Sequence, residues 1–263
     1  MKPDYKNWVP KGMVAGYMSG AAGSLIAAVV FGCVGFNGSL TWAIVLFALF
    51  ALITFVLTII SAFMLAWHNA FSYNGTSQLS RRIIEKTAAS VVVPAGGKCL
   101  DVGCGSGALS IAVAKNNPKA EIVGVDRWGK DYASFSKLLC EDNAKAEGVK
   151  NVRFMQGDAL SLPFADESFD AVTSNYVYHN IPSKDRQAIL LETLRVLKKG
   201  GTFAIHDLFT KQKYGDMEAF RQKLLETGYE KVELIDTTTG NFMTEKEAKY
   251  LFLTGSALLV GKK

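Results

Sequence analysis

The sequence predicts an α/β domain with a mainly parallel sheet, preceded by two transmembrane helices. Three observations lead to this prediction. No Asp, Glu, Lys or Arg lies between Lys11 and Arg81. Beyond Arg81, short apolar segments alternate with helical ones, which is typical of a parallel sheet with helices on both faces. A glycine-rich turn, Gly103-Cys-Gly-Ser-Gly107, directly follows the first apolar segment.

Length and composition limit the domain count and the partners. The chain has 263 residues, which suits one globular domain plus an accessory segment. We expect a membrane anchor over residues 1–72 and a globular domain over residues 73–263. The formal net charge of +5 is mild and scattered, so we expect no nucleic-acid partner. The four cysteines form no C-x-x-C pair or Cys/His cluster, so we expect no metal site and no disulfide framework.

The uncharged segment contains two runs that are long enough to cross a bilayer as helices, at about 14–36 and 40–67. A short polar turn, Phe36-Asn-Gly-Ser39, separates them. A signal peptide has a shorter apolar core and no second span. A buried hairpin of a soluble protein normally keeps a polar stripe on each helix. The pattern therefore favours a two-pass anchor.

Basic residues flank this hairpin on both sides. They are Lys2, Lys6 and Lys11 before it, and Arg81, Arg82 and Lys86 after it. The turn between the spans has none. The excess of basic residues on the cytoplasmic side of membrane proteins predicts an integral membrane protein with both termini and the globular domain in the cytoplasm.

The first span carries a small residue at every fourth position. These residues are Gly12, Gly16, Gly20, Ser24, Ala28 and Gly32. Such a stripe lets another helix approach closely within lipid. The second span is one candidate partner for it. The same span of a second copy, forming a homodimer, is the other.

Local signals place the remaining elements. A helix over 78–93 stops before Pro94, because proline disfavours helical geometry in the residue that precedes it. Strand 98–102 runs into the glycine turn, helix 108–115 follows, and strand 121–125 ends on Asp126. The other segments are expected as helix 132–147, strand 152–156, strand 169–174, helix 184–197, strand 202–206, helix 217–226, strand 231–235, helix 245–252 and strand 256–260.

The glycine turn fits two kinds of ligand. Continued to Ala108, it fits G-x-G-x-x-A, which binds the pyrophosphate of a dinucleotide. Read from Asp101, it fits the D-x-G-x-G-x-G turn found where S-adenosylmethionine binds. A carboxylate at Asp101 would face a pyrophosphate with like charge, whereas S-adenosylmethionine has no phosphate and carries an ammonium group. Asp101 therefore favours S-adenosylmethionine, and an NAD-dependent oxidoreductase remains the alternative for the fold.

Three acidic residues end three successive strands. Asp101 lies at the end of the first strand, Asp126 ends the second, and Asp158 follows the third. In open α/β sheets ligands bind beside the carboxyl ends of the strands. A carboxylate at Asp126 can accept hydrogen bonds from ribose hydroxyls, and one at Asp158 can accept from an adenine amino group.

Four motifs together resemble the class I S-adenosylmethionine-dependent methyltransferases. They are Asp101–Gly107, Gly124–Asp126, Gly157–Asp170 and Arg195–Gly201. The resemblance covers roughly residues 75–263. It is closest to the small-molecule branch that contains ubiquinone, menaquinone and tocopherol-precursor methyltransferases. It implies a Rossmann-like sheet of seven strands in the order 3-2-1-4-5-7-6, with the seventh strand antiparallel.

The resemblance also implies which residues hold S-adenosylmethionine. Asp126 would bind the ribose, with Arg127 or Trp128 beside the adenine. Asn175 follows the fourth strand, where this family meets both cofactor and substrate. The other positions are Asp101, Gly103, Cys104, Gly105 and Gly107 at the methionine end, and Asp158 and Ala159 at the adenine edge.

The segment after the fourth strand supplies the candidate catalytic residues. Methyl transfer needs a base only when the acceptor carries a proton. His179 is the first candidate, since the pKa of histidine lies near neutrality, and Tyr176 would shape the pocket or hydrogen-bond the acceptor. His206, with Asp207, ends the fifth strand and forms a second candidate pair. Alternatively, these aromatic side chains only pack, and His179 only caps its loop.

Two observations suggest the class of acceptor, namely a missing sequence motif and the expected membrane anchor. The segment after the fourth strand, Asn175-Tyr-Val-Tyr, lacks the N/D-P-P-Y/F motif of methyltransferases that act on amide or adenine nitrogen. Tethering to a bilayer raises the local concentration of a substrate that resides there. We therefore expect a hydrophobic small molecule or lipid as acceptor, such as a quinone, an isoprenoid or a lipid head group. One alternative is an enzyme whose anchor is a docking site for a membrane partner complex. Another is a cofactor-binding domain without turnover that regulates a membrane complex.

Overall fold

The computed structural model describes residues 2–129 and 134–263. The chain forms two compact units. One, the hairpin unit, comprises Lys6–Ser80. The other, the sheet domain, comprises Arg81–Lys263 together with the N-terminal residues as far as Tyr5. The sequence places the start of the globular part at residue 73 and gives no sign that the residues before the hairpin belong to it.

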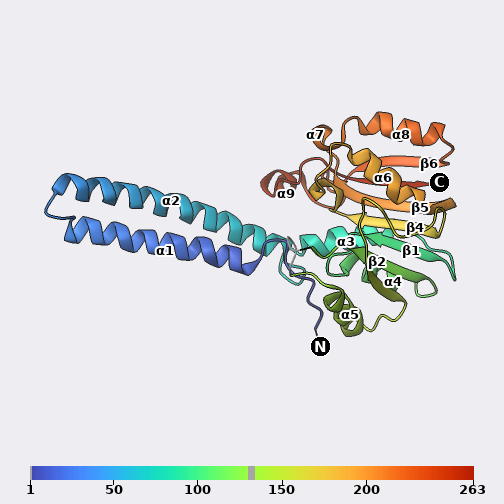
Figure 1. Cartoon of the computed structure of the whole chain (residues 1–263), viewed down its shortest axis with the longest axis horizontal. Helices are drawn as coiled ribbons and strands as arrows, with labels where there is room; N and C mark the ends of the chain where they lie inside the picture. The colour runs from blue at the N-terminus through green and yellow to red at the C-terminus, as the bar shows by residue number, and fades with distance from the viewer. Residues whose placement is uncertain (1, 130–133) are drawn as a thin grey trace. The chain divides into compact units, whose positions relative to one another are not determined.

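The hairpin unit contains two long helices, α1 (Lys11–Val34) and α2 (Leu40–Phe71), which pack side by side (Figure 1). Both are long and apolar enough to cross a membrane. Only 11% of the residues in the most apolar window of α1, and 6% in that of α2, are buried. The core helix of a soluble protein would instead bury most of such a window.

Small residues of α1 and one pair of hydroxyl side chains take part in the contact between the two helices. The hydroxyls of Ser24 and Thr54 lie 2.9 Å apart. A methyl group on Gly20 would come within 3.3 Å of Leu57, and one on Gly32 within 3.0 Å of Phe47. Part of the small-residue stripe of α1 therefore serves the close approach of α2.

The sheet has seven strands in the order β3-β2-β1-β4-β5-β7-β6, which confirms the predicted fold class. β7 runs antiparallel to both of its neighbours, and the other pairs are parallel. The strands are β1 (Lys98–Val102), β2 (Glu121–Asp126), β3 (Val152–Gln156), β4 (Phe169–Asn175), β5 (Leu197–Leu208), β6 (Lys231–Asp236) and β7 (Ser256–Lys262).

Helices cover the sheet and connect its strands (Figure 1). α4 and α5 contact the β1–β3 side of the sheet, α6 contacts β5, and α8 contacts β6. The helices after the hairpin are α3 (Leu79–Ala89), whose first two residues belong to the hairpin unit, α4 (Ala108–Asn116), α5 (Lys137–Ala146), α6 (Arg186–Arg195), α7 (Lys211–Tyr214), α8 (Met217–Glu226) and α9 (Glu245–Tyr250), with a short 3₁₀ turn, η2 (Tyr178–Asn180).

Several boundaries differ from the prediction for local reasons. α3 ends at Ala89, before the buried Val91 and Val93, because β-branched residues and the residue before a proline disfavour helical backbone. α6 begins only at Arg186, because the side chain of Asp185 caps it by accepting from the Ala188 amide. The predicted start of the helix at residue 132 lies outside the described residues, and α5 begins at Lys137.

β5 is much longer than predicted, and α7 was not expected. Residues 197–201 look like a glycine turn in the sequence, yet Leu197 already pairs with Phe169 of β4 across a bulge. α7 is only four residues long, too short to show a helical period.

The central strands are buried on both faces, as parallel strands usually are. Leu100, Val102, Val123 and Val172 are fully buried. They belong to one apolar cluster that also contains residues of α6 and α8. This core fixes the carboxyl ends of β1, β2 and β4, where the functional residues lie.

Candidate functional site

The glycine turn joins β1 to α4 through three left-handed residues. Gly103, Gly105 and Gly107 have φ of 73°, 55° and 82°, a region that side chains rarely allow. A methyl group on Gly103 would lie 2.3 Å from Val177. One on Gly105 would meet nothing within 4 Å. The turn is therefore closed on the side of β4 and open at Gly105, where a ligand has room to approach the backbone.

Asp126 ties the end of β2 to this turn. Its Oδ2 accepts from the Gly105 amide (2.9 Å), and its Oδ1 accepts from the Trp128 amide (2.8 Å). The indole N–H of Trp128 donates to the Gly105 carbonyl (3.0 Å). The carboxylate of Asp126 thus sits beside the open part of the turn, with lone pairs left for a ligand hydroxyl.

Asp101 lies beneath the turn. Only 1% of it is exposed, and its carboxyl group accepts from the hydroxyls of Ser110 in α4 (2.5 Å) and Thr173 in β4 (3.2 Å). Burial raises the pKa of Asp101 to about 7, against the opposing effect of these hydrogen bonds. In this arrangement Asp101 braces the turn between two elements.

The adenine-edge candidates follow β2 and β3. The side chain of Asp158 accepts from the Leu160 amide (2.9 Å) and is partly exposed. Ala159 packs against the apolar core. Arg127 is exposed, and its carbonyl accepts from Gln156 (3.2 Å). Because β1, β2 and β3 are neighbours in the sheet, Asp101, Asp126 and Asp158 lie along one edge.

Asp207 organises the segment after β4. One carboxylate oxygen accepts from three successive backbone amides, those of Val177 (3.2 Å), Tyr178 (2.8 Å) and His179 (3.4 Å). The other oxygen accepts from the Leu208 amide (2.7 Å). Asp207 is fully buried. It therefore fixes η2 at the end of β5, as a capping residue fixes the start of a helix.

His179 is held by the same carboxylate. Its Nδ1 lies 2.5 Å from Oδ1 of Asp207. A carboxylate that accepts several N–H groups requires Nδ1 to be the donor, so Nε2 is the nitrogen that can accept a proton in the neutral ring. The side chain of His179 is 14% exposed, whereas that of Asp207 is wholly buried. This is the geometry of a base with an orienting acid.

His206 occupies a different environment. Its Nδ1 lies 2.9 Å from Oδ1 of Asn175, and its Nε2 lies 2.9 Å from the hydroxyl of Thr237. Burial lowers the pKa of His206 to about 3, so its ring is neutral at physiological pH. The Tyr176 ring lies 4.6 Å from it, edge to face, and the Tyr176 hydroxyl lies 2.6 Å from that of Ser256.

The candidate residues from the sequence form two groups, one at the ends of β1, β2 and β3 and the other at the ends of β4 and β5. The two groups are neighbours because β1 pairs with both β2 and β4. The sequence pairs Asp207 with His206, whereas in the structure its carboxylate contacts the His179 ring. Ser110, Thr173, Thr237 and Ser256 were missed, since an isolated hydroxyl residue carries no sequence signal. Cys104 is buried, and the thiol of its neighbour Cys140 donates to the Gly105 carbonyl (3.2 Å).

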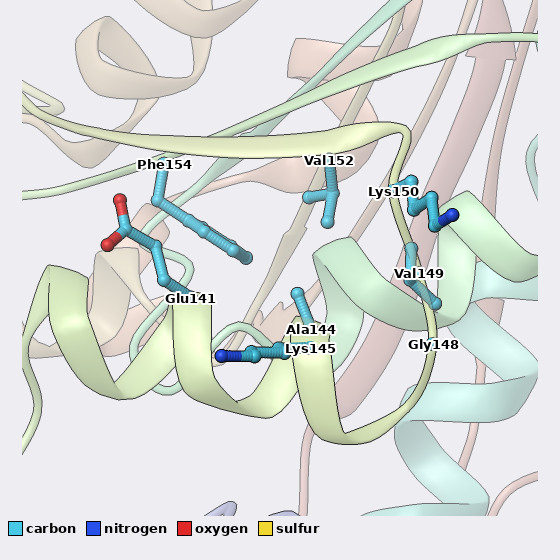
Figure 2. Close-up of a pocket in the computed structure, with 8 residues that line it drawn as sticks. All are labelled: Glu141, Ala144, Lys145, Gly148, Val149, Lys150, Val152 and Phe154. Atoms are coloured by element: carbon cyan, nitrogen blue, oxygen red, sulfur yellow. The ribbon is translucent and has the colours of Figure 1, made fainter.

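A hollow elsewhere on the sheet domain is not part of this site. Figure 2 shows Val152 and Phe154 of β3 pointing toward Ala144 of α5. It is lined by Glu141, Ala144, Lys145, Gly148, Val149, Lys150, Val152 and Phe154. Its rim contains the loop that enters β3, at the amino end of that strand. Ligands of open α/β sheets bind at the carboxyl ends. Among residues 2–129 and 134–263, no cluster of three or more His, Cys, Asp or Glu could hold a metal ion.

Comparison with curated sequences gives the family. The profile of a family described as "Methyltransferase domain" matches residues 94–252, which is more than half of the chain. The chain is also similar to the demethylmenaquinone methyltransferase of Staphylococcus aureus (strain JH9), with 34% identity over 169 residues. That match covers 60% of this chain and 66% of the relative, slightly less than two thirds of its length.

Comparison with solved structures supports the fold alone, because the identities are low. The [4+2]-cyclase SpnF shares 21% identity, with a TM-score of 0.55 over 73% of this chain and 85% of that one. A geranyl diphosphate methyltransferase in complex with GPP and sinefungin shares 14%, with a TM-score of 0.56 over 75% and 83%. The cyclase shows that this fold hosts other reactions. The family match includes the glycine turn and the three strand-end acids, and on that ground the chain belongs to the S-adenosylmethionine-dependent methyltransferases.

Proposed function

We propose that this protein is a membrane-anchored enzyme that transfers the methyl group of S-adenosylmethionine to a hydrophobic small molecule, with a reduced isoprenoid quinone as the first candidate. The observation that carries the proposal is that one chain contains both the glycine turn of a cofactor site and a hairpin whose apolar residues are mostly exposed. The curated relative supports the acceptor class, since its name places its own activity on demethylmenaquinone.

The residues present fit the cofactor. Gly105 leaves open space beside its backbone, and the Asp126 carboxylate lies next to that space. Gly103, Cys104 and Gly105 would hold the methionine end through their backbone. Asp126 would hold the ribose. When bound, S-adenosylmethionine supplies a methyl group activated by its positively charged sulfur.

The remaining cofactor candidates have narrower roles in this proposal. Asp158 and Ala159 would contact the adenine edge, with the exposed Arg127 beside it. Asp101 acts beneath the turn through Ser110 and Thr173, and Gly107 allows α4 to begin. Orientation by such a fixed turn is a large part of what an enzyme contributes to an in-line transfer.

His179 is the proposed general base. A hydroquinone carries phenolic hydroxyl groups, and loss of a hydroxyl proton raises the electron density of the oxygen and of the ring carbons. Nε2 of His179 would take that proton, while Asp207 orients the ring through Nδ1. Tyr176 and His206 are positioning residues in this scheme, since burial keeps His206 neutral and holds it between Asn175 and Thr237.

We further propose that the protein spans the membrane twice with both termini in the cytoplasm. The Asp4 amide donates to Asn143 (2.7 Å), and the Tyr5 carbonyl accepts from Ser106 (3.0 Å). Residues on either side of the hairpin thus belong to one unit, which requires an even number of membrane crossings. The basic flanks then favour the cytoplasmic side.

The small-residue stripe is assigned to the hairpin itself. Gly20 and Gly32 face side chains of α2, and Ser24 bonds to Thr54. A methyl group on Gly12 or Gly16 would meet nothing within 4 Å. A homodimer through α1 therefore remains an alternative that would use the Gly12 end of the helix.

Two measurements test the proposed function on the full chain in lipid nanodiscs. Calorimetry should show S-adenosylhomocysteine binding well above NAD, and Asp126→Ala should weaken that binding by roughly 1.5–3 kcal/mol. Labelled S-adenosylmethionine should then pass its methyl group into a membrane lipid extract. Tight NAD binding would favour an oxidoreductase. Cofactor binding without any label transfer would favour a regulatory domain.

A further inference from the structure

Asp4 and Tyr5, which directly precede the hairpin unit, form an N-terminal strap on the sheet domain. Its Asp4 is bonded in both directions to Asn143 of α5. The Asp4 amide donates to Oδ1 of Asn143 (2.7 Å), and Nδ2 of Asn143 donates to the Asp4 carbonyl (3.0 Å). Asn143 is only 2% exposed. The Asn143 side chain thus makes the two backbone hydrogen bonds with Asp4 that a neighbouring β-strand would otherwise make.

The same strap contacts the cofactor turn. The hydroxyl of Ser106, which lies between Gly105 and Gly107, donates to the Tyr5 carbonyl (3.0 Å). Nδ2 of Asn143 also donates to the Ser106 carbonyl (3.0 Å). Asn143 therefore joins the strap and the turn through a single side chain.

Tyr5 anchors the strap with its side chain. It is 6% exposed, and its hydroxyl donates to Glu147 (2.9 Å), which also pairs with Lys115 of α4 (2.6 Å). The Tyr5 side chain thus holds the strap to the sheet domain.

From these contacts we propose that the strap is a positioning element for S-adenosylmethionine, although it precedes the membrane anchor and lies about one hundred residues from the turn in sequence. The proposal rests on the proposed function for the identity of the ligand. A turn with three left-handed glycines loses conformational freedom when it closes on a ligand. Strap contacts that hold Ser106 in place beforehand reduce that loss and so raise the affinity.

The coupling has to be reciprocal. If the strap raises the affinity of the turn for the cofactor, bound cofactor stabilises the strap on the sheet domain by the same factor. A strap that only packs on the surface would leave both quantities unchanged. This difference separates a positioning role from a merely structural one.

The first arm of the test changes the strap in the full chain in nanodiscs. Asp4 and Tyr5 are both replaced by Gly, which removes the buried Tyr5 side chain that anchors the strap and makes the backbone that bonds to Asn143 and Ser106 more flexible, while the hairpin is unchanged. The dissociation constant of S-adenosylhomocysteine should rise about five- to tenfold. The matched control replaces Lys2 and Pro3 by Gly, two residues upstream, and should stay within about twofold of the unmodified chain. Tyr5→Phe keeps the ring and the carbonyl bond to Ser106, so it should bind nearly as well as the control.

The second arm needs no variant. Amide hydrogen exchange at Asp4 should slow when S-adenosylhomocysteine is added to the unmodified chain. The strap proposal alone would be overturned by three results together. The unmodified chain binds S-adenosylhomocysteine normally, its exchange at Asp4 does not change on binding, and the variant with Gly at positions 4 and 5 keeps the same affinity. An unmodified chain that binds no S-adenosylhomocysteine would overturn both this proposal and the proposed function. If the variant with Gly at positions 4 and 5 fails to fold, the exchange measurement on the unmodified chain decides whether the strap proposal holds.

Discussion

His179 combines a partly exposed ring with a fully buried carboxylate partner. We expect His179→Gln to lower methyl transfer to a hydroquinone roughly 10²- to 10⁴-fold, the usual contribution of a general base. The affinity for S-adenosylhomocysteine should be unchanged, because the proposed cofactor contacts lie at the ends of β1, β2 and β3 and at Asn175, and do not include His179. Asn180→Ala, at the exposed next residue, is the control. Full activity of His179→Gln would show that the acceptor needs no base here.

Because Asp101 is buried, we expect the free energy of unfolding to depend on pH with a definite sign. The pKa of Asp101 is raised to about 7 in the folded protein from 3.8. Between about pH 4 and 7 the unfolded chain has released this proton and the folded chain retains it. The free energy of unfolding therefore falls as pH rises through this window, by at most roughly 1.4 kcal/mol per pH unit, and levels off above pH 7.

Asp101→Asn should remove that slope, because an amide does not titrate. Thermal unfolding of the sheet domain in the detergent-solubilised full chain, measured from pH 4 to 8, checks this expectation. Glu233→Gln, in β6 at an exposed position, serves as the control. A slope that persists in Asp101→Asn would mean that another group takes up the proton on folding.

Gly103, in the turn between β1 and α4, packs directly against Val177 in the loop after β4. Gly103→Ala would place a methyl group 2.3 Å from Val177 at a φ of 73°. We expect a loss of roughly 1–3 kcal/mol in unfolding free energy, together with weaker S-adenosylhomocysteine binding. The double variant with Val177→Ala should recover the part caused by the clash. Wild-type stability of Gly103→Ala would contradict this packing.

The strands were predictable because buried strands are short apolar runs with polar ends. Residues 98–102 and 152–156 have the predicted bounds, and the strand-end acids followed from them. The pairing of His179 with Asp207 was not predictable without the strand order. It arises because β4 and β5 are neighbours in register, with Asn175 opposite His206.

The strap shows the other limit of sequence reasoning. Asp4 and Asn143 are 139 positions apart, and both are ordinary residues in polar segments. Their contact depends on where the hairpin returns the chain, and no local pattern specifies that. The sequence places every acidic and glycine candidate beyond Arg81, and the structure adds Tyr5 and Asp4 to the surroundings of the turn.

The full chain combines a hairpin with a domain that includes residues from both sides of it. A reporter fused within the Asn37-Gly38 turn should therefore report the side opposite to the cytoplasm, while reporters at the two termini report the cytoplasm. The reporters at the two termini serve as the reference for the cytoplasmic side. A cytoplasmic signal from the turn would exclude a two-pass hairpin, and termini on opposite sides would contradict the strap contacts.

If the hairpin anchors the enzyme as proposed, the acceptor is met within the same bilayer. The full chain can be placed in nanodiscs with a long-tailed hydroquinone in the same disc or in separate discs, with saturating labelled S-adenosylmethionine. We predict that labelled methyl appears rapidly in acceptor that shares the disc and slowly, if at all, in acceptor held elsewhere. Equal rates in the two arrangements, or label only in water-soluble molecules, would contradict the account.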